Sequence, residues 1–279
     1  MTMPRTRPVI GAQVFVVMLL FGCSQSASVA QQSPTTDPAI KAYQAMMLSD
    51  DNAMGAATSN HCNTVQDTAC PAAAARVVAA LQSWLDDLNR FQTPARFATI
   101  GAQMKRHVAA AIAYLNASAA ATVAKNQPAL DRSIVAAVSE REWVDRLTAS
   151  ISHSSPATTA VYRNLVKSEK SDLDKCAGCQ RLTAQTPLSC DGAAPTDCNS
   201  LVLDAASQMA TFQGAVVLDA APSTMGAKDA LLQSDLAQGD TALIAMMGDL
   251  LKGDQAGFTA ARPSLGRALA AVDVDAAAV

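Results

Sequence analysis

Cysteines are the residues whose type and spacing could do the most chemistry in this chain of 279 residues. Six of the seven cysteines fall into three pairs along the sequence: Cys62 and Cys70, Cys176 and Cys179, and Cys190 and Cys198. Thiols at such spacings can form structural disulfides, exchange disulfides with other proteins or bind zinc. The seventh cysteine, Cys23, stands apart, directly after an apolar segment near the beginning of the chain.

Two reactive uses of the Cys176-Ala-Gly-Cys179 segment are disfavoured by its surroundings. A thiol oxidoreductase motif comes with alternating strands and helices, and no such pattern surrounds this segment. A zinc site with four cysteines would need a second tight pair, whereas Cys190 and Cys198 are separated by seven residues. Gln180 stands where covalent haem attachment requires a histidine. We therefore expect a structural role for these cysteines.

Acidic and histidine side chains indicate no catalytic or metal site. The chain has three glutamates and three histidines: Glu140, Glu142, Glu169, His61, His107 and His153. No glutamate begins the Glu-x-x-His motif of a di-iron helix bundle. Glu140 and Glu142 lie two residues apart and do not share a helix face, so we interpret both as solvated surface residues. No spacing brings the histidines together. We expect no catalytic residue, metal or cofactor.

The composition predicts an all-α protein. Half of the residues are hydrophobic and only 4% are aromatic. Abundant alanine with leucine, glutamine and methionine favours helices, and the scarcity of aromatic and β-branched residues disfavours an all-β fold. A net charge of -3 excludes a nucleic-acid-binding protein that depends on a basic face. The apolar fraction excludes a chain that is mainly disordered.

The first 22 residues have the pattern of an export signal. Arg5 and Arg7 precede an almost wholly apolar run over residues 9–22. That run is shorter than the roughly 20 residues that span a bilayer, but it suits the apolar region of a signal peptide. It ends in Leu20-Phe21-Gly22-Cys23. This sequence resembles the lipobox of bacterial lipoproteins, although Phe21 is larger than the residue usual at its position.

The lipobox resemblance implies a lipid anchor and a location in the cell envelope. It implies that the signal peptide of residues 1–22 is removed, and that Cys23 is lipidated and holds the protein on a membrane. Residues 23–36 then form a lipidated flexible tether, rich in serine, glutamine and threonine. Ser24 after the cysteine implies the outer membrane if the cell has one. We expect an exported lipoprotein of the cell envelope.

The remaining chain contains an internal repeat with an offset of 128 residues. The matched positions include Cys62 and Cys190, Cys70 and Cys198, Trp84 and Phe212, Pro94 and Pro222, and Leu115 and Leu243. We interpret this register as a duplication and expect two tandem antiparallel four-helix bundles, over residues 37–152 and 153–279. The second copy carries an insertion that includes Cys176 and Cys179.

In each copy, apolar residues at helical spacing and capping residues predict four helices. The expected helices are 37–54, 71–92, 95–122 and 127–150, followed by 157–175, 199–219, 223–249 and 254–272. Asp37, Asn126 and Asp254 are suited to cap helix N-termini, and Thr224 could cap weakly. Trp84 and Phe212 should lie in the core.

An exported chain with six remaining cysteines predicts disulfides. The repeat favours pairing Cys62 with Cys70 and Cys190 with Cys198, which leaves Cys176 with Cys179. Other pairings among the last four cysteines stay open. Each repeated pair would staple the loop between the first and second helices of its bundle.

The sequence favours binding over catalysis. We expect a non-catalytic lipoprotein that binds an unknown envelope protein or polymer through an apolar patch or groove, and no nucleic acid. The alternative is a small-ligand-binding protein with an enclosed pocket inside or between the bundles. Polar groups for such a pocket could come from Tyr43, Tyr114 or Arg76. An enzyme would need a constellation of residues from distant parts of the chain.

Overall fold

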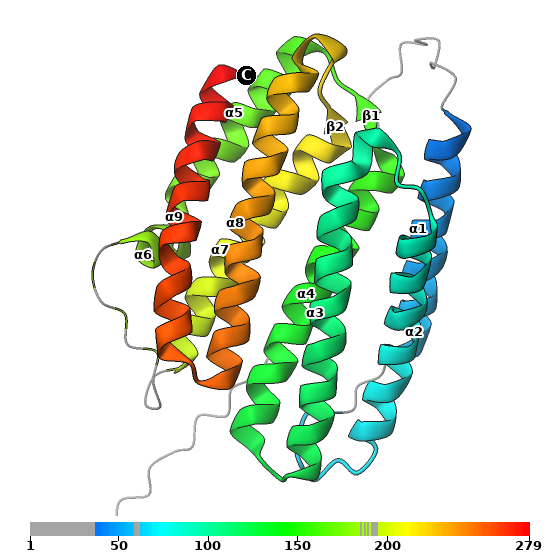
Figure 1. Ribbon diagram of the computed structural model, residues 1–279, viewed down its shortest axis with the longest axis vertical. Coiled ribbons are helices and arrows are strands. Elements are labelled where there is room, and N and C mark those ends of the chain that lie inside the picture. Colours follow the sequence, from blue (N-terminus) through cyan, green and yellow to red (C-terminus); the bar gives the residue numbers. More distant parts are fainter. Residues whose placement is uncertain (1–36, 59–61, 185, 187, 189, 191–194) are drawn as a thin grey trace, which may run out of the picture. The chain divides into compact units, whose positions relative to one another are not determined.

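The computed structural model describes residues 37–58, 62–184, 186, 188, 190 and 195–279. The predicted signal peptide, the lipobox with Cys23 and the tether fall on residues 1–36 and lie outside the described residues. The described residues are helical apart from loops and two strands of two residues each (Figure 1). This confirms the all-α prediction.

The first half of the described chain has four long helices joined by short connections. They are α1 (Pro38–Ala57), α2 (Cys70–Arg90), α3 (Ala98–Val123) and α4 (Gln127–His153), with the 3-10 turn η1 (Ala95–Phe97) before α3. The predicted caps are confirmed: Asp37 accepts a hydrogen bond from the amide of Ala39, and Asn126 accepts one from the amide of Ala129. Helix α1 contacts α2 and α4, and α3 contacts α2 and α4, so the four helices close a ring (Figure 1).

The second half has a similar order of elements with one short helix added. Its elements are β1 (Ser155–Pro156), α5 (Thr159–Lys175), α6 (Ala177–Thr183), α7 (Pro195–Leu218), β2 (Asp219–Ala220), η2 (Ser223–Met225), α8 (Gly226–Lys252) and α9 (Gln255–Ala278). Helices α5, α7, α8 and α9 contact one another in a ring, and α6 packs on α7. Asp254 caps α9 as predicted. The weak cap expected from Thr224 is wrong, because Thr224 lies inside η2 and α8 begins without a side-chain cap.

Equivalent local geometry recurs in the two halves at the same spacing of 128 residues. The turns η1 and η2 begin at Ala95 and Ser223, and the helices after them begin at Ala98 and Gly226. Left-handed residues precede the last helix of each half, with φ values of 53° at Lys125 and 69° at Gly253. These matches reflect shared turn and capping chemistry, because each left-handed residue is followed by a capping side chain.

A short parallel pair of strands joins the halves. Ser155 of β1 lies opposite Asp219 of β2, and Pro156 lies opposite Ala220. The backbone amide of Ala157 extends the pairing by donating to the carbonyl of Ala220. The end of α4 is thereby held beside the end of α7, a contact that no periodic pattern in the sequence indicated.

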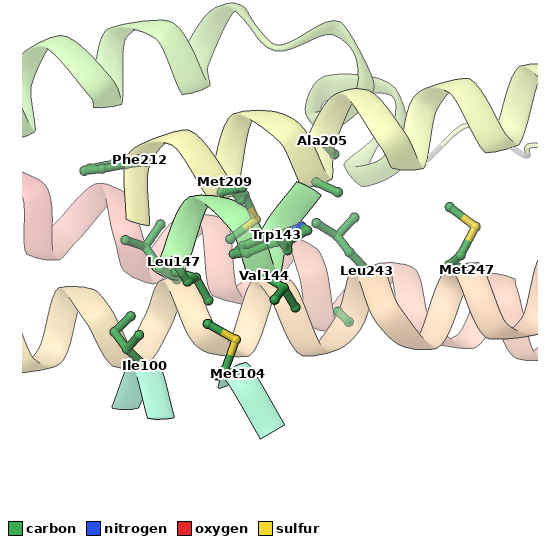
Figure 2. Packing of buried hydrophobic residues seen from close by; sticks show 14 of the residues in the cluster. Ile100, Met104, Trp143, Val144, Leu147, Ala205, Met209, Phe212, Leu243 and Met247 are labelled. Carbon is green, nitrogen blue, oxygen red and sulfur yellow. The ribbon is translucent and has the colours of Figure 1, made fainter. Parts of the chain in front are cut away.

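The two halves share one hydrophobic core. Helix α4 packs on α7, and both α3 and α4 contact α8, so side chains from the two halves interleave. Figure 2 shows Met104 of α3, Trp143 of α4 and Met209 of α7 within this cluster. Residues 37–279 form a single compact unit, and the predicted bundle boundary at residues 152 and 153 falls at the end of α4 inside it. Trp84 and Phe212 are fully buried, as predicted.

One apolar stretch of the described residues is long enough to cross a membrane. Cys198–Leu218 in α7 meets the requirements of length and hydropathy, and 56% of its most apolar window is buried. The helix contacts α4, α5, α6 and α8, which is the environment of a core helix.

Candidate functional site

A cavity of about 550 Å³ lies where the two halves meet, between the turns η1 and η2. Its lining also includes the first turns of α3 and α8, the end of α7, and residues of both short strands. The apolar part of the wall comes from Phe97, Pro156, Val216, Val217 and Pro222. A volume of this size lies in the range of small-molecule binding sites, about 300–1,000 Å³.

Arg96 supplies the positive charge of the cavity. Pro94 ends the extended link after α2, and the single turn η1 then places Arg96 at the rim. The guanidinium carbon lies 5.3 Å from the centroid of the Phe97 ring, and Nη2 donates to the hydroxyl of Ser154. Burial lowers the pKa of Arg96, and the charge of Asp229 opposes that shift. Arg96 is therefore a half-buried cation supported by an aromatic face.

Asp229 supplies the negative charge from the first turn of α8. One carboxylate oxygen accepts from the hydroxyl of Tyr162, and the other accepts from the amide of Gln233 at 2.8 Å. Burial raises the pKa of Asp229, while these two hydrogen bonds and the charge of Arg96 oppose the rise. Both oxygens thus have donors, and among the described residues no carboxylate forms an ion pair with Arg96.

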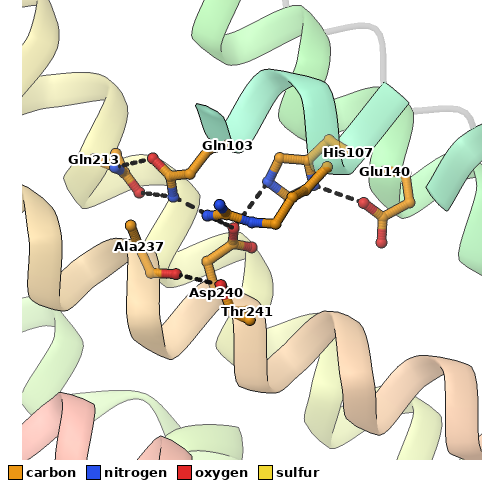
Figure 3. Close-up of polar contacts among 8 residues, drawn as sticks. Gln103, His107, Glu140, Gln213, Ala237, Asp240 and Thr241 are labelled. Carbon is orange, nitrogen blue, oxygen red and sulfur yellow. Dashed lines mark hydrogen bonds and ion pairs between the residues drawn. The ribbon is translucent and has the colours of Figure 1, made fainter. Parts of the chain in front are cut away.

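A second polar feature lies in the core, where five side chains from both halves contact one another (Figure 3). They are Gln103 and His107 of α3, Glu140 of α4, Gln213 of α7 and Asp240 of α8, and none is more than 3% exposed. His107 Nδ1 lies 2.6 Å from Glu140 Oε2, and His107 Nε2 lies 3.1 Å from Asp240 Oδ2. The side-chain amides of Gln103 and Gln213 donate to each other, and Gln103 also donates to Asp240 at 3.3 Å. We call these residues the core polar cluster.

The carboxylates of the core polar cluster hold His107 in its charged form. Burial lowers the pKa of His107, but the charges and hydrogen bonds of Asp240 and Glu140 raise it more, to about 9. Burial raises the pKa of Glu140, and the adjacent His107 opposes that rise. Arg106 lies 4.0 Å from Asp240, so two cations balance two carboxylates. The His107 ring also stacks on Trp143, with centroids 4.5 Å apart.

The core polar cluster corrects the prediction for Glu140. Glu140 was expected on the solvated surface but is 3% exposed, whereas Glu142 is exposed as expected. His107 does join a charged cluster, although with carboxylates rather than with other histidines. His153 is exposed, and His61 lies outside the described residues. The helical spacing of the sequence could have indicated that both residues are buried. His107 falls on the same helix face as the buried Met104 and Ala111. Glu140 likewise shares a face with the buried Ala136 and Val144.

The polar residues predicted for a ligand pocket do not line the cavity. Tyr43 is fully buried in the core of the first half. Tyr114 donates to the carbonyl of Ile244 at 3.4 Å. Arg76 is exposed on α2. The pocket residues are instead Arg96, Asp229 and Gln233, which only the junction of the halves brings together.

Disulfides join the six cysteines in the pairing that the repeat favours: Cys62 with Cys70, Cys176 with Cys179, and Cys190 with Cys198. Glutamines at equivalent positions hold the two loops of the repeat. Gln127 accepts from the amide of Val65 at 3.0 Å, and Gln255 accepts from the amide of Cys190 at 2.8 Å. Disulfides form in oxidising compartments, which agrees with an exported protein.

The Cys176–Cys179 disulfide lies where α6 packs on α7. Cys176 and Cys179 are 5% and 3% exposed. The carboxylate of Asp204, on α7, accepts from the backbone amide of Gly178 at 2.7 Å. The bridge therefore fixes the added helix against the core, as a structural role requires.

No group of three or more histidine, cysteine, aspartate or glutamate side chains in the described part of the chain is arranged to hold a metal ion. No family model matches the chain, and neither a curated protein nor a solved structure is significantly similar to it. What the cavity can do therefore follows from its own geometry. It can hold a small molecule against an apolar wall, with the cation of Arg96 and the carboxylate of Asp229 at the polar end.

Proposed function

We propose that this chain is a non-catalytic lipoprotein of the cell envelope, anchored through Cys23, that binds a small ligand in the cavity between its halves. The cavity is the observation that carries the proposal, because it combines a suitable volume with convergent polar groups. The lipobox resemblance supports the anchor, and the three disulfides support export.

The cavity favours the small ligand over the protein or polymer partner expected from the sequence. A protein or polymer would use an extended exposed groove, whereas this cavity gathers its lining from seven elements at one junction. The chemistry of the lining supports binding without catalysis, because its described residues include neither histidine nor cysteine. The core polar cluster does contain a histidine, but it is too deeply buried to meet a substrate.

We also propose that the two halves arose by duplication of a four-helix bundle. The shared spacing of turns, caps and left-handed residues supports this origin. The cavity lies between the equivalent turns η1 and η2, so joining the two copies would have created the binding site. A single copy would lack half of the lining.

Ligand capture tests the binding proposal. The full chain is incubated with a small-molecule extract, washed and denatured, and the released compounds are identified by mass spectrometry. We expect the wild type to retain a small molecule that the variant Gly226→Trp does not. Gly226 lines the cavity, and a Cβ there would meet no atom within 4 Å, so the indole can fill the cavity without a backbone clash. Equal retention by both proteins would contradict the proposal.

Cell fractionation tests the anchor. We expect the variant Cys23→Ser to leave the membrane fraction, because the residue that carries the lipid is lost. The matched control Ser26→Ala, in the same tether, should stay with the membranes. Retention of Cys23→Ser on membranes would contradict the lipobox interpretation.

A further inference from the structure

We propose that the ligand of this cavity is a small organic monocarboxylate with an apolar body, and that its carboxylate pairs with Arg96. This inference rests on the proposed function, since it names the chemical class that the same cavity accepts. Three observations carry it: a guanidinium without a carboxylate in ion-pair contact among the described residues, a carboxylate in the same lining whose two oxygens each have a donor, and an apolar wall.

Among the described residues, no carboxylate lies within ion-pair distance of the Arg96 guanidinium. It is the only cation in the described lining, it is half-buried, and its hydrogen bond to Ser154 uses Nη2 alone. Phe97 supports the guanidinium from one side, which fixes its position without neutralising its charge. A planar guanidinium presents paired N–H donors that match the two oxygens of a carboxylate. A bound carboxylate could therefore contact the guanidinium directly, which Asp229 in the same lining does not.

Asp229 limits the charge that a ligand can carry. Its two oxygens each accept one hydrogen bond, from Tyr162 and from Gln233, which holds the carboxylate in place. Its charge still faces the same cavity and repels additional negative charge. A ligand with one negative charge can pair with Arg96, whereas a phosphate dianion would be repelled. The pair of charges thus favours a carboxylate over a phosphate.

The remainder of the cavity suits an apolar group. Pro156 of β1 and Pro222 before η2 face this space, and the almost fully buried Val216 and Val217 at the end of α7 lie behind it. Burying a methylene group of a ligand against such a wall is favourable, because apolar surface is removed from water. Affinity should therefore grow with the apolar body, and the carboxylate should set orientation.

Calorimetric titration with three probes of the same chain length tests this assignment. Octanoate carries one negative charge, octanamide carries none, and octyl phosphate carries up to two. We expect the wild type to bind octanoate more tightly than either of the other probes. The variant Arg96→Gln should lose about 10–100-fold in octanoate affinity and change little toward octanamide. Arg96→Lys, which keeps the charge but not the paired donors, should fall between them.

Controls separate the carboxylate assignment from binding in general. Arg76→Gln, an exposed arginine on α2, should bind octanoate like the wild type. Gly226→Trp should lower the affinity for octanoate and for octanamide, because the indole occupies the cavity. Equal octanoate affinity in wild type and Arg96→Gln overturns the assignment, and so does tighter binding of octyl phosphate or no binding of octanoate. In each of these cases the captured-ligand experiment still decides separately whether the cavity binds a small molecule.

Discussion

At the scale of single residues, His107 is the side chain on which the core depends most. Its two ring nitrogens face carboxylates of different halves, Glu140 at 2.6 Å and Asp240 at 3.1 Å. Buried charges are tolerated when each has an opposite charge and its hydrogen-bonding atoms are satisfied. Removing the imidazolium would leave two buried carboxylates facing each other with only the partly exposed Arg106 nearby.

We expect His107→Leu to lower the free energy of unfolding by about 3–5 kcal/mol, because it breaks a buried charge pair from one side. Urea denaturation followed by circular dichroism measures the loss. His153→Leu is the matched control, since His153 is exposed and its substitution should change the stability by less than about 0.5 kcal/mol. Equal stability of the two variants would show that the cluster adds nothing to the fold.

The same histidine predicts that stability falls with rising pH. The pKa of His107 is about 9 in the folded chain, above its ordinary value of 6.5, so the folded state binds this proton more tightly. The resulting stability is fully present below pH 6.5 and is lost as the pH rises through 9. The raised pKa of Glu140 acts in the same direction, because a protonated Glu140 is also favoured by folding. The loss should be on the order of 3 kcal/mol.

Denaturation at intervals between pH 6.5 and 9.5 measures this loss. Beginning at pH 6.5 avoids the titration of Asp50, whose pKa is raised to about 6 by burial and by Asp87. Ending at pH 9.5 avoids the tyrosines, whose pKa values burial raises above the ordinary value of 10. His107→Leu should show a shallower profile over this range, because the part of the slope that comes from the imidazole is lost. A slope as steep as that of the wild type would assign the pH dependence to another group.

The helical spacing of apolar residues in the sequence could predict which of these polar residues are buried, but not which of them contact each other. His107 lies on the apolar face of α3, and its burial follows from that spacing. Its partners do not, because Glu140 is 33 residues away and Asp240 belongs to the other half. Only tertiary packing selects which buried acid meets which buried base. The same holds for Arg96 and Asp229 in the cavity.

At the scale of elements, the short helix α6 packs on α7 with almost no space between the backbones. A Cβ at Gly178 would lie 2.3 Å from the carbonyl oxygen of Leu201 and 3.0 Å from the Cβ of Asp204. Glycine at this position is therefore required by close approach. The backbone amide of Gly178 also donates to Asp204, which holds the two helices at this distance.

We expect Gly178→Ala to destabilise the protein by about 1–3 kcal/mol, because the colliding atom is backbone and α6 must shift. Gly55→Ala is the matched control. Gly55 lies in α1, where an added Cβ would meet no atom within 4 Å, so alanine should stabilise by up to about 1 kcal/mol. Thermal unfolding of both variants gives the comparison. A neutral Gly178→Ala would mean that α6 is free to move away from α7.

Most helices could be predicted because their signals are local. Asp37, Asn126 and Asp254 cap where expected, and the long helices end within a few residues of their predicted limits, except that α9 continues past its predicted end at residue 272 to Ala278. Helix α6 was missed because its seven residues are too few for a periodic pattern, and its position depends on a disulfide. The strands β1 and β2 were missed because two residues per strand carry no alternation.

At the scale of the whole molecule, the two halves behave as one structure built from two similar parts. Each half closes a ring of four helices, yet α4 packs on α7 and the core polar cluster crosses the same boundary. Either half alone would expose the apolar faces of α3 and α4 or of α7 and α8. It would also separate buried acids from His107, so the folding of each half should depend on the other.

We therefore expect residues 37–279 to unfold in a single cooperative transition. Both tryptophans, Trp84 and Trp143, lie on helices of the first half and are buried, so their fluorescence reports on the packing of those helices, including the boundary where Trp143 joins the shared core. Far-ultraviolet circular dichroism reports on the helices of both halves. The two signals should have the same midpoint in urea, because the shared core couples the halves.

A substitution far from the boundary makes this prediction sharper. Phe258 is fully buried in α9, and Phe258→Ala should destabilise the second half by about 3–5 kcal/mol through the cavity that it leaves. If the halves fold as one unit, the tryptophan fluorescence of the first half moves to lower urea by the same amount as the circular dichroism. If each half were an independent bundle, the fluorescence midpoint would stay in place while the circular dichroism gained an early step. The coupling between the halves also decides whether the cavity exists without both of them, because Arg96 and Asp229 come from opposite sides of the boundary.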